Sequence, residues 1–532
     1  MRILAPNYAD QSSRKFLAGL FFAVVFVAAA YEFSQYVIND NIIMLAYITL
    51  ICVGGAFVIA MLKNWRNGVY FFLTWLLFED FARKMLGNNM AIFFAKDVLL
   101  LVVYISFMVA LRRKLVETFR PPFLIPLLLF VWLAIMQVFN PSAATLLYGI
   151  LGVKLFLSYI PLLFVGYALI NSETDLRRFF YINAGLVLVI GLLGIAQSVI
   201  GPGFLNPARP ADEIRALSTL YRVSPITGLI SYRPTSVFVS ATRYTNFLLI
   251  SWLLILGFTG YLLLRHRAGR NLAFITIAVV YAGIIMGASR GPFMWSAGSL
   301  IVIAAAFIWG APRRQREFLR AFRTIQRAAL AVTLALVTLF FIFPDALMSR
   351  LAIYSETLMP GAKHSELQAR TWDYPMRNFL MAFDYPEWPY GYGIGTSSLG
   401  VQYIAKIFHE PPTGLGVESG FGSLVIELGI GGLMLWLLMS FAILFAAWKV
   451  VKKLKGSPLF PISFAIFWYA FLLLLPITFA TIVIYEDFVM NAYLWLLLGI
   501  LFRLPKLVLA PQSTVQQGTA PVLPHTFPIR AR

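Results

Sequence analysis

Apolar runs recur along almost the whole chain and are separated mostly by short polar gaps. A helix rises about 1.5 Å per residue, so a run of about 20 apolar residues spans roughly 30 Å of hydrocarbon. We expect about fourteen such spans, at residues 16–36, 42–61, 67–82, 90–111, 122–139, 145–170, 179–200, 244–264, 271–288, 291–310, 328–344, 420–448, 459–482 and 487–503. The pattern predicts an all-α polytopic membrane protein, because the alternating pattern of a transmembrane barrel is absent.

One long polar stretch interrupts this pattern and divides the chain. The division has four parts: a transmembrane bundle at 1–344 that includes an outer loop at 201–243, a large loop at 345–419, C-terminal transmembrane helices at 420–503, and a tail at 504–532. The tail is rich in Pro, Gln, Thr and Ala, a composition typical of disorder.

The distribution of charged residues predicts which side of the membrane each loop occupies. Only 12% of residues are charged and 60% are hydrophobic, whereas soluble proteins carry about 25% charged residues. The net charge of +20 lies mainly in short gaps such as 112–114 and 313–316, as in cytoplasmic loops, and does not indicate nucleic acid. This predicts cytoplasmic termini and a large loop on the opposite, periplasmic side. The single cysteine, Cys52, excludes a disulfide framework and a thiol metal site.

Local signals within the large loop predict a short helix and a turn. Asp373 is expected to cap a helix over residues 374–383, which should end before Pro386. Gly391, Gly393 and Gly395 follow it. We expect this glycine-rich turn to let the backbone approach another surface closely.

Several charged residues fall at the outer ends of predicted spans: Glu79, Asp80, Lys96, Asp97, Lys154, Arg290 and Glu418. Charges at membrane depth are costly, so they face a cavity or one another. One interpretation is a polar cavity that includes Lys96, Asp97 and Lys154. The alternative is that Asp97 and Lys154 pair and only stabilise the bundle.

Two arginine segments are candidates for phosphate binding. Arg290 lies in the tight turn Ser289-Arg290-Gly291 between two spans, and Arg233 and Arg243 flank hydroxyl residues ahead of another span. A planar guanidinium suits bidentate binding of phosphate. The alternative is that each arginine reaches lipid headgroups.

Two carboxylates lie where the large loop re-enters the membrane. Glu418 precedes the span, and Glu427 is nine residues deeper, about two and a half helical turns. Glu418 is placed to act as a base. We expect Glu427 to be a hydrogen-bonded structural group between helices.

Taken in order, these motifs resemble the bacterial O-antigen ligase and polymerase superfamily of integral membrane glycosyltransferases. The resemblance rests on the Ser-Arg-Gly turn, the segment from Arg233 to Phe238, Arg-x-Trp at 370–372, Gly-x-Gly in the large loop, and a polar residue nine positions before Glu-Leu-Gly-Ile-x-Gly. It covers about residues 230–440 and implies a membrane glycosyltransferase C-like bundle in the bacterial inner membrane.

The resemblance also implies residue roles. Arg233, Arg290 and Arg370 would bind the diphosphate of an undecaprenyl-diphosphate-linked donor, with Arg377 as a helper, and no metal or other cofactor would be needed. Ligases of the superfamily usually have His where this chain has Glu418, which favours a polysaccharide polymerase over an O-antigen ligase. His409 is a second candidate for the base.

The remaining expectations concern sugars, partners and the competing class of function. Trp372, Trp388, Tyr390 and Tyr392 suit stacking on sugar rings, or an aromatic belt at the membrane interface. The expected partners are an acceptor glycan, membrane lipids and, as an open alternative, a chain-length regulator. A lipid-linked oligosaccharide flippase is the alternative from another class, although transporters tend to contain internal repeats and none is visible here.

Overall fold

The computed structural model describes residues 54–86, 90–206, 220–223, 228, 230–265, 268–312, 326, 333, 337, 340–341, 344–358, 372–398, 401, 414–481 and 487–509. The chain forms two compact units. The first comprises residues 1–72 and 97–112, and the second residues 73–96 and 113–532. The helices α3 (Trp65–Met85) and α4 (Met90–Arg112) each belong partly to both units.

The described part of the first unit is a small helical cluster. The helix Gly54–Lys63 contacts the beginning of α3, where Phe57 stacks on Phe71, and the end of α4. The hydroxyl of Ser106 donates to the carbonyl of Met61 over 3.0 Å. The ring of Phe107 meets that of Trp65 edge to face, with centroids 5.3 Å apart.

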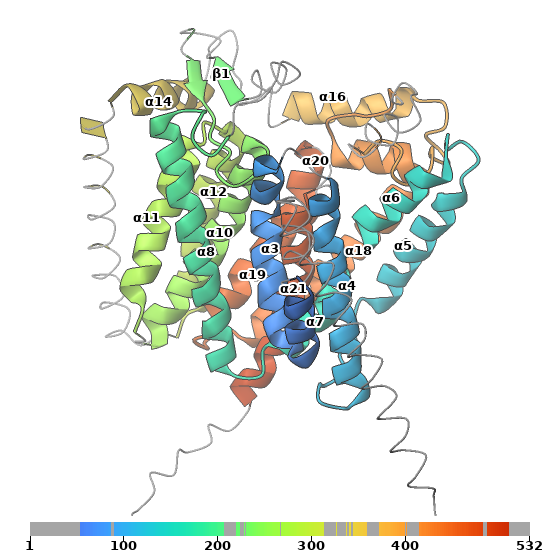
Figure 1. Ribbon diagram of the computed structural model, residues 1–532, viewed down its shortest axis with the longest axis horizontal. Coiled ribbons are helices and arrows are strands. Elements are labelled where there is room, and N and C mark those ends of the chain that lie inside the picture. Colours follow the sequence, from blue (N-terminus) through green and yellow to red (C-terminus); the bar gives the residue numbers. More distant parts are fainter. Residues whose placement is uncertain are drawn as a thin grey trace, which may run out of the picture. The chain divides into compact units, whose positions relative to one another are not determined.

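The second unit holds the other described helices (Figure 1). They are α5 (Leu124–Met136), the 3₁₀ turn η1 (Gln137–Phe139), α6 (Leu146–Leu157), α7 (Leu162–Leu169), α8 (Glu173–Ile200), α10 (Ala241–Arg265), α11 (Arg270–Met286), α12 (Arg290–Gly310), α14 (Pro344–Leu358), α16 (Tyr374–Leu380), the 3₁₀ turn η4 (Met381–Asp384), α18 (Gly420–Lys453), α19 (Phe460–Leu472), the π-turn η5 (Leu473–Ile477), α20 (Thr478–Ala480) and α21 (Phe488–Leu509). Two strands, β1 (Tyr221–Val223) and β2 (Ile230–Tyr232), form an antiparallel hairpin.

Membrane-spanning helices dominate the described chain. Among the described residues, eight helical segments are long and apolar enough to cross a membrane, and three apolar helices are shorter. The expected class, a helical polytopic membrane protein, is therefore confirmed. The count of fourteen spans stays a prediction, because most residues of three predicted spans, 16–36, 42–61 and 328–344, lie outside the described ones.

The core of the second unit forms around α10 and around the pair α7 and α21. Helix α10 contacts α8, α11, α12, α19 and α21 and is buried along most of its length, as expected for a helix that is apolar on all sides. Helices α7 and α21 approach closely at Gly166 and Gly499. A Cβ at Gly166 would lie 2.1 Å from the carbonyl oxygen of Leu496, so only glycine permits this contact.

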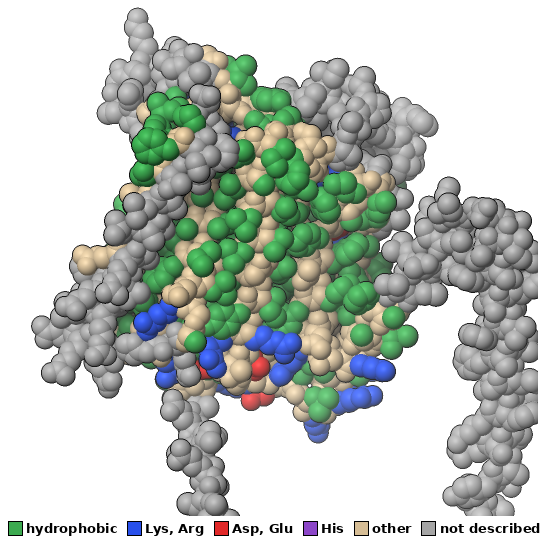
Figure 2. Space-filling model, turned by 60° about the vertical axis from the view of Figure 1, so that its left-hand side comes forward, with side chains coloured by type: hydrophobic (Ala, Val, Ile, Leu, Met, Phe, Trp, Pro, Cys, Tyr) green, Lys and Arg blue, Asp and Glu red, His purple; other side chains and the backbone are tan. Residues whose placement is uncertain are grey.

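The second unit has two chemically different ends. The end that carries the hairpin, α14 and α16 is the loop end (Figure 1). At the opposite, basic end the amide of Gly456 donates to the carbonyl of Gly310 over 2.8 Å, which joins the end of α12 to the loop between α18 and α19. Lysine and arginine side chains gather along one rim of the surface in Figure 2, next to a broad hydrophobic band. This distribution is the one expected for basic loops on one membrane face.

The structure corrects and extends the expectations for the loops. The hairpin and α14 were not predicted. The short helix in the large loop is confirmed, since α16 and η4 cover residues 374–384 and end before Pro386. The expected cap is wrong: Asp373 itself has helical angles (φ −64°, ψ −48°) and its side chain makes no capping hydrogen bond.

Candidate functional site

Four basic residues of the loop end form what we call the arginine cluster: Arg222, Arg233, Arg290 and Arg350. Nη2 of Arg233 donates to Oγ of Ser289 over 2.9 Å, and Ser289 directly precedes Arg290. Nη2 of Arg350 donates to the carbonyl of Tyr232 over 2.9 Å. Segments from three parts of the chain, the hairpin, the α11–α12 turn and α14, therefore meet at one place.

The α11–α12 turn is tight and strained. Helix α11 ends at Met286 and α12 begins at Arg290, with Ala288 in the left-handed region at φ +46°. Ser289 occupies the N-cap position of α12, yet its side chain makes no capping bond. Its hydroxyl accepts from Arg233 instead. Ser289 therefore does not cap α12, and its hydroxyl instead holds the guanidinium of Arg233 beside the N-terminus of this helix.

Helix α14 closes the other side of the cluster. Nε of Arg350 donates to the carbonyl of Met286 over 2.9 Å, and the hydroxyl of Tyr354 donates to the carbonyls of Ile284 and Ile285 over 3.1 and 3.0 Å. The last carbonyls of a helix need partners from outside it. Arg350 and Tyr354 therefore act as a cap for the end of α11.

The cluster combines burial with like charge. Burial, and after it the positive charge of Arg222, lower the pKa of Arg233 below its usual value. Burial lowers the pKa of Arg350 to about 10. Arg290 is only 6% exposed and lies at the positive end of the α12 dipole. Arginine charges and a helix N-terminus thus favour an anion at this place.

Buried polar side chains hold the segment that carries Arg233. Oε1 of Gln197 accepts from the amides of Thr235 and Ser236 over 2.8 and 2.7 Å. Nζ of Lys84 donates to the hydroxyl of Thr235 over 3.1 Å and to the carbonyl of Ser236 over 2.8 Å. Ser236 has φ +51°, and these bonds fix that unusual conformation. The sequence alone did not indicate Gln197 or Lys84.

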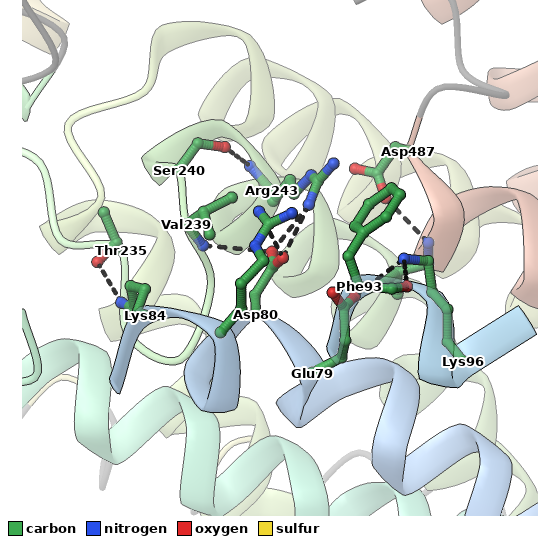
Figure 3. A network of polar contacts seen from close by, with 12 residues as sticks. Glu79, Asp80, Lys84, Phe93, Lys96, Thr235, Val239, Ser240, Arg243 and Asp487 are labelled. Atoms are coloured by element: carbon green, nitrogen blue, oxygen red, sulfur yellow. Dashed lines mark hydrogen bonds and ion pairs between the residues drawn. The ribbon is translucent and has the colours of Figure 1, made fainter. Parts of the chain in front are cut away.

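A second group of charges, the Asp80 network, lies at the ends of α3 and α10 (Figure 3). The carboxylate of Asp80 accepts two bonds from Nη1 of Arg243, at 3.1 and 2.9 Å, and one from the amide of Val239 at 3.2 Å. Nη2 of Arg83 lies 3.2 Å from the same carboxylate. Asp487 lies close to Arg243 and adds a second negative charge, so opposite charges meet here and this network stabilises the loop end (Figure 3).

The expected polar cavity around Lys96, Asp97 and Lys154 stays a prediction, but Lys96 itself is paired. Lys96 is fully buried, and its Nζ lies 3.3 Å from Oε2 of Glu79 and 3.3 Å from the ring centre of Phe93 (Figure 3). A buried ammonium is stabilised by a carboxylate and an aromatic face, and this one needs no cavity. Lys154 also lies near Phe93, at 4.8 Å. Asp97 belongs to the other unit, so its pairing with Lys154 stays a prediction.

Glu418 makes its contacts with α16. The hydroxyl of Tyr374 donates to its carboxylate, and its amide donates to Oδ1 of Asn378 over 3.2 Å. The side chain is exposed at the loop end, just before α18. An exposed carboxylate with a phenol as its neighbour is able to accept a proton from a bound hydroxyl group.

Glu427 and the glycine-rich turn form one structural unit. The Glu427 carboxylate is buried and accepts bonds from the amides of Gly395 and Ser397, both at 3.0 Å, and from the Ser397 hydroxyl at 2.8 Å. Helix α18 is broken at Gly429, and the turn enters this break. A Cβ at Gly391 would lie 2.6 Å from the Glu427 carbonyl oxygen. The predicted structural role of Glu427 and the close approach of this turn are both confirmed.

The other predicted residues are spread over the large loop. Trp372 and Arg377 line an open groove on α16, and Tyr390 is 77% exposed. Trp388 is half-buried against Phe383, and Tyr392 against Tyr385. Two candidates, Arg370 and His409, lie outside the described residues.

Among the residues that the structure describes, no three His, Cys, Asp or Glu side chains gather in a way that could hold a metal ion. The expectation of metal-independent chemistry stays a prediction.

The class of protein is a polytopic helical membrane protein with a cluster of buried and half-buried arginines at one end. Comparison with protein-family models and with curated proteins finds no match to this chain. Its likeness to the O-antigen ligase and polymerase superfamily therefore rests on the motifs in its own sequence.

Proposed function

We propose that this chain is a membrane glycosyltransferase that polymerises a polysaccharide from a lipid-diphosphate-linked donor. The observation that carries the proposal is the bond from Arg233 to Ser289, which places one guanidinium beside Arg290 at the N-terminus of α12. Guanidinium groups and a helix N-terminus are the two devices by which proteins most often bind phosphate.

The proposed reaction transfers the glycan from the lipid diphosphate to an acceptor hydroxyl group. An acceptor hydroxyl oxygen attacks the anomeric carbon of the donor, and the bond from that carbon to the diphosphate oxygen breaks. The bonding electrons pass to the diphosphate, whose added charge the arginine cluster stabilises. The hydroxyl proton passes to the carboxylate of Glu418, which Tyr374 orients. The products are the extended glycan and the free lipid diphosphate.

The test replaces Arg233 or Arg290 with Ala and measures the length distribution of the polysaccharide and the amount of protein in the membrane. Loss of one preorganised charge donor costs about 10²–10³ in rate. We expect long chains to disappear while the protein level is kept. Lys in either position keeps the charge but lacks the planar guanidinium that binds phosphate with two hydrogen bonds. We expect it to restore only part of the activity. The exposed Arg113, replaced by Ala, is the matched control. Wild-type chain lengths in both cluster variants would refute the proposal.

Two further assays separate this proposal from its alternatives. In a deletion strain, single repeat units in place of long chains support a polymerase, whereas unattached long chains indicate a ligase. Proteoliposomes that contain only this protein and a labelled lipid-linked sugar test for flipping. Flipping without chain growth would assign the protein to the transporters.

A further inference from the structure

At the basic end, four lysines lie within seven residues of the end of α18 and the loop after it: Lys449, Lys452, Lys453 and Lys455. All four side chains are exposed. Within the described residues, none of them forms an ion pair with a carboxylate. This is a concentrated positive patch, and the arginine cluster at the loop end takes no part in it.

Aromatic rings adjoin the patch. Trp309 of α12 and Trp448 of α18 stack with their ring centroids 5.8 Å apart and their planes within 7°. Nζ of Lys455 lies 4.0 Å from the ring centre of Trp309, which is 39% exposed. Nζ of Lys449 lies 4.3 Å from the ring centre of Phe445. Half-exposed tryptophans beside lysines are typical of the level at which lipid headgroups meet the hydrocarbon.

An apolar stripe runs along α18 toward these lysines. Met434, Leu438, Phe441 and Phe445 are 59%, 50%, 58% and 63% exposed. Their steps of four, three and four residues place them on one face of the helix, and the next steps on that face reach Lys449 and Lys452. The surface therefore offers an apolar track that ends in positive charge.

We propose that this surface of α12, α18 and their adjoining loop binds an anionic glycerophospholipid. The lysines contact its phosphate, the two tryptophans lie beside its glycerol backbone, and an acyl chain follows the stripe of α18. A soluble phosphate ester would use the lysines alone, and the exposed stripe favours the lipid. The proposal is independent of the glycosyltransferase function.

The experiment titrates dioleoyl phosphatidylglycerol into the purified, detergent-solubilised full-length protein and counts bound lipid by native mass spectrometry. Dioleoyl phosphatidylcholine is the neutral comparison. Each cation near an anionic lipid contributes about a fivefold factor in binding. The variant with all four lysines changed to Gln should lose at least about tenfold in affinity for phosphatidylglycerol. Trp309→Leu, which leaves every charge in place, should weaken binding several-fold.

The matched control removes the same charge elsewhere on the surface. Arg112, Arg113, Lys114 and Arg120 are also exposed, and their change to Gln should leave binding unchanged. Equal losses in both quadruple variants would overturn the proposal, because net charge alone would then explain binding. Wild-type affinity in the lysine variant would also overturn it. Displacement of the lipid by an equal concentration of glycerol 3-phosphate would assign the patch to a soluble phosphate.

Discussion

The arginine cluster and the Asp80 network lie in the same unit, and their guanidinium groups contact different kinds of partner. In the Asp80 network, the guanidinium groups of Arg83 and Arg243 converge on one carboxylate. In the arginine cluster, Arg233 and Arg350 bond to a hydroxyl group and to backbone carbonyls, and Arg222 lowers the pKa of Arg233.

The difference separates charges that hold the fold from charges that we propose bind a phosphate. Each guanidinium of the Asp80 network already faces a carboxylate, so binding of a further anion would gain less there. In the arginine cluster, by contrast, Arg222 and Arg233 lie close enough to repel each other, and a phosphate bound there would relieve that repulsion. We therefore expect substitutions in the network to lower the stability of the fold, and substitutions of Arg233 or Arg290 to lower activity.

The largest effect on stability is expected for Asp80→Asn. The change leaves Arg83 and Arg243 buried without their shared countercharge, and breaking a buried ion pair in this way costs about 3–5 kcal/mol. Thermal unfolding of the purified protein should show a large fall in the melting temperature. Asp384→Asn is the control, because Asp384 is exposed on η4. A melting temperature within error of wild type for Asp80→Asn would show that the Asp80 network does not stabilise the fold.

Glu427→Gln tests how much the hydrogen bonds to the buried Glu427 carboxylate contribute to stability. Its two oxygens accept three bonds from Gly395 and Ser397. An amide nitrogen in place of one oxygen faces an N–H or O–H donor, and we expect a loss of about 1–3 kcal/mol in the free energy of unfolding. Limited proteolysis should then cut the turn around Gly391 faster than in wild type. Unchanged protection would show that the turn is held by other contacts.

Arg350→Met tests whether an arginine of the arginine cluster itself contributes to the stability of the fold. The change removes the donors to the carbonyls of Met286 and Tyr232, at a cost of about 1–3 kcal/mol, part of which is offset because the desolvated charge is also removed. Stability should therefore fall less than in Asp80→Asn. An equal or larger fall would show that Arg350 belongs with the structural charges alone.

The smallest effect is expected for Glu117→Gln, a matched charge at the exposed basic end. Bonds from Lys506, at 2.6 Å, and then from Arg503, at 2.5 Å, lower the pKa of Glu117. Because the folded pKa is lowered, the stabilisation is present above pH 4.5 and is lost as the pH falls below it. An exposed pair contributes under about 1 kcal/mol. Melting temperatures of wild type and variant should differ slightly at neutral pH and converge in acid; a constant difference would contradict this.

The sequence by itself determined the class of the protein and the position of many of its helices. Apolar runs of sufficient length become helices in a membrane because the backbone has no other way to satisfy its polar groups there. The short helix before Pro386 and the close approach of the glycine-rich turn were also visible, since both depend on local backbone restrictions.

Only the tertiary structure decided which charges meet. Lys96 has the same signature in the sequence whether it faces a cavity or pairs with Glu79, and Ser289 the same whether it caps α12 or accepts from Arg233. The contributions of Gln197, Lys84 and Arg350 were hidden for the same reason. A buried polar group is satisfied by partners distant in sequence, and periodicity and local preferences carry no information about those partners.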